Sequence, residues 1–69
     1  MRVKLRRIEL GLTQEELSQK VNIARARIVE VEKGYYENLR LREMKKIAEV
    51  LKTTIYHLFL GGGGVDDFK

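Results

Sequence analysis

The side chains best suited to binding another molecule lie on the outward side of segment 24–33. These outward positions are Arg25, Ala26, Arg27, Val29 and Glu30. On a helix that fits the major groove of DNA, about 12 Å wide, such groups can reach the edges of bases. Catalysis has no comparable set, because His57 is the single histidine and no His, Asp, Glu or Ser group shows a recognised catalytic spacing. The pattern predicts a binding protein without a cofactor, not an enzyme.

Two short helical patterns joined by a tight turn hold these residues. The first begins at Thr13, and the Glu16 carboxylate three residues on completes a capping box with the Thr13 hydroxyl. Asn22 occupies the turn, where a left-handed conformation is expected and asparagine tolerates it better than most residues. The second pattern, 24–33, is followed by Gly34, a natural C-cap. Two helices with such a connection form a helix-turn-helix arrangement.

Three further helical patterns complete an all-α chain. One runs over residues 2–10 and ends at Gly11, one runs over residues 41–51, and a short one over residues 55–60 is capped by Thr54. Apolar residues recur in the two longer patterns at helical spacing. They are Val3, Leu5, Ile8, Leu10, Leu41, Met44, Ile47, Ala48 and Leu51. The sequence therefore predicts a compact bundle of five helices.

Length and composition restrict the remaining possibilities. The 69 residues permit one domain, which we place at residues 1–60, followed by a flexible glycine-rich and acidic tail at 61–69. The absence of cysteine excludes a disulfide or a thiolate-bound metal. Every apolar run is too short to span a bilayer, and the basic start lacks the apolar core of a signal peptide, so we expect a cytoplasmic protein. The net charge of +4 favours nucleic acid as a partner, although a solvated basic surface is the alternative.

A set of motifs in a fixed order gives the chain a specific resemblance. The motifs are Arg7, Gly11-Leu12-Thr13-Gln14-Glu15-Glu16-Leu17, Lys20-Val21, Ile28, Val31-Glu32-x-Gly34, Lys46-Ile47-Ala48-x-x-Leu51 and Ile55-x-x-Leu58-Phe59. Each is weak alone. Their order and spacing over roughly residues 2–60 resemble the lambda-repressor-like, or Cro/C1-type (XRE), domains, especially the small lambdoid phage repressors. The resemblance implies a five-helix DNA-binding domain with its helix-turn-helix at the second and third helices.

Carried over residue by residue, the family's base-reading positions fall on Arg25, Ala26 and Glu30. Arg25 can donate two hydrogen bonds to guanine O6 and N7, and Ala26 can touch a thymine methyl. Glu30 can accept from cytosine N4 or pair with Arg27 one turn back. The residues expected to contact the DNA backbone are Thr13, Gln14, Arg27, Lys33, Tyr35, Arg40 and Arg42. Tyr36 is either a further donor or a residue packed over the edge of the core.

The resemblance also implies an ion pair between Arg7 and Glu32 that ties the first helix to the third. The alternative is that Arg7 is a solvated surface cation. The chain departs from the family pattern at Ala24, where the family commonly places a Ser or Thr N-cap, and at Asn22, which replaces the usual Gly of the turn. Alanine cannot cap, which costs about 1 kcal/mol and leaves the start of the third helix less firmly fixed.

The short helix 55–60 has more apolar side chains than one monomer can bury. In the related repressors this region supplies the dimer contact, which falls here on Ile55, Tyr56, His57 and Leu60. A symmetric dimer would set two recognition helices about one DNA turn, ~34 Å, apart. The expected function is a dimeric, sequence-specific transcriptional repressor that reads a two-fold symmetric site on double-stranded DNA, with no membrane or small-molecule partner. The alternative is a protein-interaction module, or an antitoxin-like domain, on the same scaffold.

Overall fold

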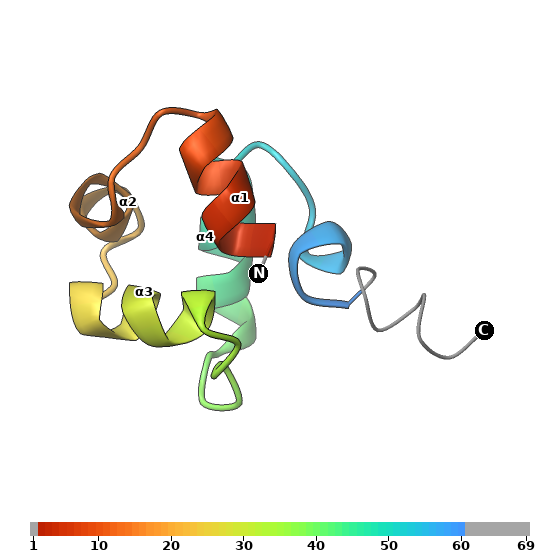
Figure 1. The fold of residues 1–69 in the computed structure, drawn as a ribbon. Helices are drawn as coiled ribbons and strands as arrows, with labels where there is room; N and C mark the ends of the chain where they lie inside the picture. Colours follow the sequence, from red (N-terminus) through yellow and green to blue (C-terminus); the bar gives the residue numbers. More distant parts are fainter. Residues whose placement is uncertain (1, 61–69) are drawn as a thin grey trace.

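The computed structural model describes residues 2–60, and their regular structure is entirely helical. The elements are α1 (Arg2–Glu9), α2 (Gln14–Val21), α3 (Arg25–Glu32), α4 (Leu41–Val50) and η1 (Tyr56–Leu60). Figure 1 shows α3 at the bottom of the molecule and η1 at its right-hand side. The expected all-α, five-helix architecture is confirmed, but the last element is a π-helical turn and not an α-helix. The predicted flexible tail lies outside the described residues. Within residues 2–60, no helix has the length and apolarity needed to cross a bilayer.

One hydrophobic core joins all five elements. Its largest fully buried side chains are Leu17, Ile28, Ile47, Leu51 and Val3. The other apolar members are Val21, Ile23, Val31, Leu39, Ala48, Leu58 and Phe59. The packing places α2 against both α3 and α4, and α1 against α3 and η1. The third helix is therefore supported from two sides, and its remaining face is free.

The apolar residues of α1 do not all face this core. Val3 is fully buried, whereas Leu5 is 61% and Ile8 is 54% exposed. At about 100° per residue, positions 5 and 8 project from the side of the helix opposite position 3. Arg7 takes the core-facing position one turn after Val3. The helix thus has an inner face that contains a charged residue and an outer face that is partly apolar.

The helix-turn-helix has the predicted capping box at the start of α2 and the predicted left-handed residue between α2 and α3. The Thr13 hydroxyl accepts a hydrogen bond from the Glu16 N–H at 3.0 Å, and the Glu16 carboxylate accepts one from the Thr13 N–H at 2.8 Å. Asn22 has φ 57° and ψ 44°, which is the expected left-handed conformation, and its N–H donates to the Ser18 carbonyl. Gly34, just past α3, has φ 98°. The capping box thus fixes the start of α2, and Asn22 turns the chain from α2 toward α3.

A side chain of α1 binds the C-terminal end of α4, and the loop between α3 and α4 packs against η1. The Arg6 Nε donates to the Leu51 carbonyl at 2.8 Å, which satisfies one of the carbonyls that a helix leaves unpaired at its C-terminus. Thr54 caps the following turn, because its hydroxyl accepts from the His57 N–H at 3.0 Å. Tyr36 packs edge-on against Phe59 with ring centroids 5.3 Å apart. Tyr36 therefore covers the edge of the core, which was one of its two expected roles.

Candidate nucleic-acid interface

Part of the outward face of α3 is exposed and carries polar side chains that form no ion pair within residues 2–60. Arg25, Ala26 and Glu30 are all exposed. Among residues 2–60, neither Arg25 nor Glu30 forms an ion pair, so the alternative in which Glu30 pairs with Arg27 is wrong. At about 100° per residue the three positions fall within an arc of roughly 140°. Val29 lies half-buried in the same arc and adds a small apolar surface.

The start of α3 carries no side-chain cap. Ala24 holds the N-cap position with an extended ψ of 141°, and no side-chain hydrogen bond is present there. The first N–H groups of a helix lack partners within the helix and attract anions. Because Ala24 replaces the Ser or Thr cap of the family, the first backbone N–H groups of α3 remain available to solvent or to a bound phosphate.

A buried ion pair fixes the other end of α3. The ion pair expected between Arg7 and Glu32 is present, with Nε–Oε2 at 2.7 Å and the second nitrogen 3.2 Å from Oε1. Each residue is only 8% exposed. The remaining Arg7 nitrogen donates to the Leu12 carbonyl at 2.7 Å. One charged group in α1 thus ties together α3 and the α1–α2 connection, in a bidentate geometry that is stronger than a single contact.

Gln14 belongs to the same network. Its amide nitrogen donates to Glu32 Oε1 at 3.1 Å. This contact was not anticipated from the sequence, in which Gln14 was expected to meet the DNA backbone. A side-chain amide has two N–H donors, so Gln14 can hold Glu32 with one and still offer the other to a phosphate. The N-terminus of α2 and the C-terminus of α3 are therefore coupled through one carboxylate.

A second ion pair crosses from α3 to α4. Arg27 meets Glu43 in a bidentate pair, with nitrogen–oxygen distances of 2.7 and 3.0 Å, and also donates to the Asn38 carbonyl at 3.4 Å. The Glu43 carboxylate also accepts from the Arg40 N–H at 2.9 Å, at the start of α4. The hydrogen bonds from Arg27 and then from the Arg40 N–H lower the pKa of Glu43 to about 2. The hydrogen bond to Glu43 likewise raises the pKa of Arg27. Arg27 is thus engaged within the protein, which its expected role as a phosphate contact did not foresee.

Glu43 should make the domain sensitive to acid. Its pKa falls from an ordinary 4.5 to about 2 on folding, so its contribution to stability is complete above about pH 4.5 and is lost as the pH falls toward 2. In Glu43→Gln this titration is absent. We expect its urea unfolding midpoint to decline less than that of the wild type between pH 4.5 and pH 2, with Glu49→Gln on the same helix as the matched control. Equal declines in all three proteins would contradict the prediction.

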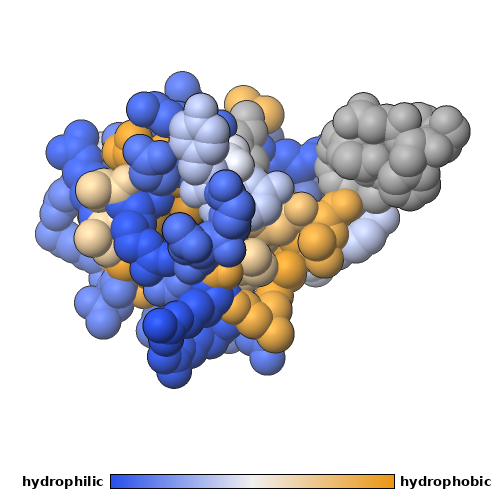
Figure 2. All heavy atoms as spheres, turned by 90° about the horizontal axis from the view of Figure 1, so that it is seen from below, coloured by the Kyte–Doolittle hydropathy of each residue, from blue (hydrophilic) through white to orange (hydrophobic). Residues whose placement is uncertain are grey.

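The other expected backbone contacts border the α3 face. Lys33, Tyr35, Arg40 and Arg42 are exposed, and Tyr35 shares a hollow with Arg27 and Glu30. Arg42 lines a separate hollow beside the Asn22 turn together with Lys46. Lys46 was absent from the expected contacts, although its spacing of four residues from Arg42 placed both cations on one face of α4. Viewed from the α3 side, the surface over these elements is largely hydrophilic (Figure 2).

The residues expected at a dimer contact do not all lie free. Tyr56 and Leu60 are 58% and 62% exposed, whereas Ile55 packs against the core. His57 is exposed, and its Nε2 lies 3.4 Å from an Arg2 side-chain nitrogen. Leu5 of α1 borders the same hollow as His57. Apolar atoms gather over η1 at the right of Figure 2. The exposed apolar surface therefore includes α1 as well as η1.

Two short helices, a left-handed residue between them and a free outer face on the second define a helix-turn-helix domain. A helix-turn-helix family model matches residues 3–58. The chain belongs to this family, of the Cro/C1-type (XRE) class. The chain is also similar to three proteins described as regulators. Two from Archaeoglobus fulgidus, both described as uncharacterized HTH-type transcriptional regulators, are 47% identical over 62 residues (87% of each chain) and 41% identical over 59 residues (86% of this chain and 82% of the other). A third with the same description, from Methanothermobacter thermautotrophicus, is 53% identical over 34 residues, which is 49% of each chain. No solved structure matches.

Proposed function

We propose that this protein is a sequence-specific transcriptional regulator that places α3 in the major groove of double-stranded DNA. The observation that carries the proposal is the exposed, unengaged face of Arg25, Ala26 and Glu30, on a helix fixed to the rest of the domain by ion pairs at Arg27 and Glu32. The descriptions of the archaeal relatives support it. In this role Arg25 reads guanine, Ala26 or Val29 contacts a thymine methyl, and Glu30 accepts from cytosine N4.

The surrounding cations and helix ends hold the phosphate backbone. We assign this role to Lys33, Tyr35, Arg40, Arg42 and Lys46, together with the N-terminal turns of α2 and α3. Because Arg27 neutralises the charge of Glu43, this carboxylate repels the DNA phosphates less. Arg27 itself then acts mainly by holding α3 against α4. Neither catalysis nor a cofactor enters this function.

A homodimer explains the exposed apolar side chains. Leu60 and Tyr56 of η1, with Leu5 of α1, would meet their copies across a two-fold axis. The two α3 helices would then lie about 34 Å apart and read two half-sites of a symmetric operator. Occupation of such an operator within a promoter would repress transcription. A protein-interaction module is the second candidate, because the same apolar surface can receive a different protein.

The proposal is tested by selecting bound duplexes from a random pool at two salt concentrations. We expect a two-fold symmetric motif with half-site centres about one helical turn apart. Affinity should fall with salt, with a log–log slope of roughly −0.9 per neutralised phosphate. Binding without a selected motif would mean that the protein binds DNA without sequence specificity. An absence of binding at both salts would favour the protein-interaction module.

Repeating the selection with Arg25→Ala tests the base-reading role. The variant should lose discrimination at one position of each half-site, at a cost of about 1–3 kcal/mol. The matched control is Arg42→Ala, which removes a guanidinium beside the α3 face and should weaken all duplexes evenly while reducing the salt slope by about 1. If Arg25→Ala also lowers affinity evenly, Arg25 is a phosphate contact.

A further inference from the structure

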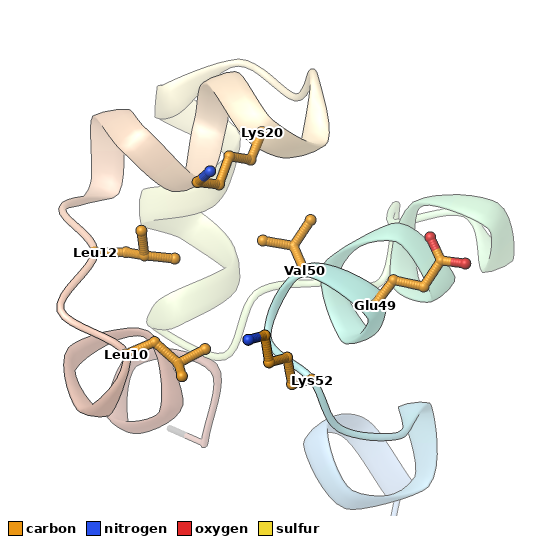
Figure 3. A pocket seen from close by; sticks show the side chains of 6 residues that line it. All are labelled: Leu10, Leu12, Lys20, Glu49, Val50 and Lys52. Atoms are coloured by element: carbon orange, nitrogen blue, oxygen red, sulfur yellow. The ribbon is translucent and has the colours of Figure 1, made fainter.

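A groove opens on the side of the domain opposite α3. It has a volume of about 560 Å³ and is lined by Leu10, Leu12, Lys20, Glu49, Val50 and Lys52. We call it the α1–α2–α4 groove. Figure 3 shows Leu12 and Val50 pointing toward each other across it, the Lys20 and Lys52 amino groups on either side, and the Glu49 carboxylate turned away. Its volume lies in the range of about 300–1,000 Å³ that is usual for binding sites.

The two lysines of this groove, Lys20 and Lys52, form no ion pair within residues 2–60. The ion pairs of that part of the chain are Arg6–Glu9, Arg7–Glu32 and Arg27–Glu43, and none of them uses Lys20 or Lys52. Leu10, Leu12 and Val50 pack against the core from its edge and remain partly exposed. Covering them removes apolar surface from water, which is favourable. A fitting occupant therefore combines apolar side chains with two negative charges.

The chain itself continues with such a segment. After Leu60 the sequence is GGGGVDDFK, in which Asp66 and Asp67 stand between Val65 and Phe68. From Leu60 to Phe68 the chain can span about 26–29 Å, at roughly 3.3–3.6 Å per residue. The domain measures 37 × 25 × 19 Å along its principal axes. Tyr56, the first residue of η1, comes four residues after Lys52, and η1 lies on the Lys52 side of the groove in Figure 3.

We propose that residues 65–68 of the same chain bind in the α1–α2–α4 groove, with Phe68 over Leu12 and Val50 and the carboxylates of Asp66 and Asp67 beside Lys20 and Lys52. A short tether holds a segment near its site at an effective concentration in the millimolar range, on the order of 10⁻³ M, so a weak contact is sufficient. The groove faces away from α3. The tail therefore occupies it without competing with DNA, and it covers the place where the ends of α1, α2 and α4 meet.

The chain has no cysteine, so a single spin label can report the position of the tail. In the 69-residue chain, Lys69→Cys would be labelled with a nitroxide and the amide signals of the ¹⁵N-labelled chain recorded. We expect selective loss of intensity at Leu12, Val50 and Lys52, and none at Arg25 or Glu30 on the opposite side. Uniform losses, or losses confined to η1, would overturn the proposal.

Charge reversal provides the matched control. Changing Asp66→Lys and Asp67→Lys in the labelled chain should restore the intensities at Leu12 and Val50, and adding Lys20→Glu with Lys52→Glu should remove them again. Persistence of the losses after the first reversal would contradict the charge pairing.

Mixing spin-labelled ¹⁴N chains with unlabelled ¹⁵N chains distinguishes a tail that binds its own chain from a tail that binds a second copy. Losses that appear in the mixture would mean that the tail of a second copy fills the groove, which would overturn binding within one chain.

Discussion

Arg7→Met should lower the free energy of unfolding by about 3–5 kcal/mol, because it strands the charge of Glu32 in a buried position. Glu32 is 8% exposed, and the Arg7 guanidinium supplies two of its hydrogen bonds. The same change takes a donor from the Leu12 carbonyl. Against a total of about 5–15 kcal/mol for a typical domain, this loss is large. Urea unfolding followed by circular dichroism measures it.

Two further variants separate this effect from the loss of a surface charge. Lys4→Met, on the exposed side of the same helix, should change stability by no more than about 0.5 kcal/mol. The double variant Arg7→Met with Glu32→Met should recover much of the loss, because neither charge is then left without a partner. If Arg7→Met alone behaves like Lys4→Met, the ion pair is not holding α1 to α3.

Leu60→Glu should abolish the proposed dimer and lower the affinity for a duplex with two half-sites by a factor on the order of 10²–10⁴. Leu60 is 62% exposed on η1, so the monomer should keep its helical content. In a two-fold symmetric dimer, the carboxylates introduced by Leu60→Glu in the two protomers would lie close together in an apolar contact and repel each other. Affinity for a duplex with one half-site should not change. Sedimentation and titration of the two duplexes check the prediction.

Leu41→Glu is the control for the sedimentation experiment. Leu41 is 61% exposed, but it lies at the start of α4 and not on η1. It should leave the oligomeric state as in the wild type. If Leu60→Glu also sediments like the wild type, η1 is not the dimer contact, and the surface around Leu5 and Ile8 of α1 becomes the next place to test.

The features that the sequence predicted best are those set by neighbours in the chain. The Thr13–Glu16 capping box spans three residues, and the left-handed Asn22 depends on its own side chain and on the turn. Both follow from the residues present, whatever packs around them. The resemblance supplied what the local pattern could not, namely the contact between Arg7 and Glu32, which are 25 residues apart.

The remaining features depend on how the helices meet. The Arg27–Glu43 pair joins residues 16 apart, and a sequence with several cations and carboxylates does not say which of them will meet. Helical spacing marked Leu5, Ile8 and Leu41 as apolar positions, but not whether the core or solvent would receive them. In the candidate site too, some features were predictable from the sequence and others depend on how the helices pack. Its exposed face at Arg25 and Glu30 was expected, whereas the engagement of Gln14 with Glu32 required the folded chain.

The two ion pairs on α3 have a consequence for the thermodynamics of recognition. Arg27 joins the helix to α4 and Glu32 joins it to α1, so its orientation is set before any partner arrives. In the proposed role of α3, binding would order mainly side chains such as Arg25, at about 0.5–1.5 kcal/mol for each long side chain that is immobilised. The backbone of α3 adds no comparable entropic term. For the proposed base reading, we therefore expect a mismatched base to be accommodated poorly by a shift of the helix, because such a shift would break these two ion pairs.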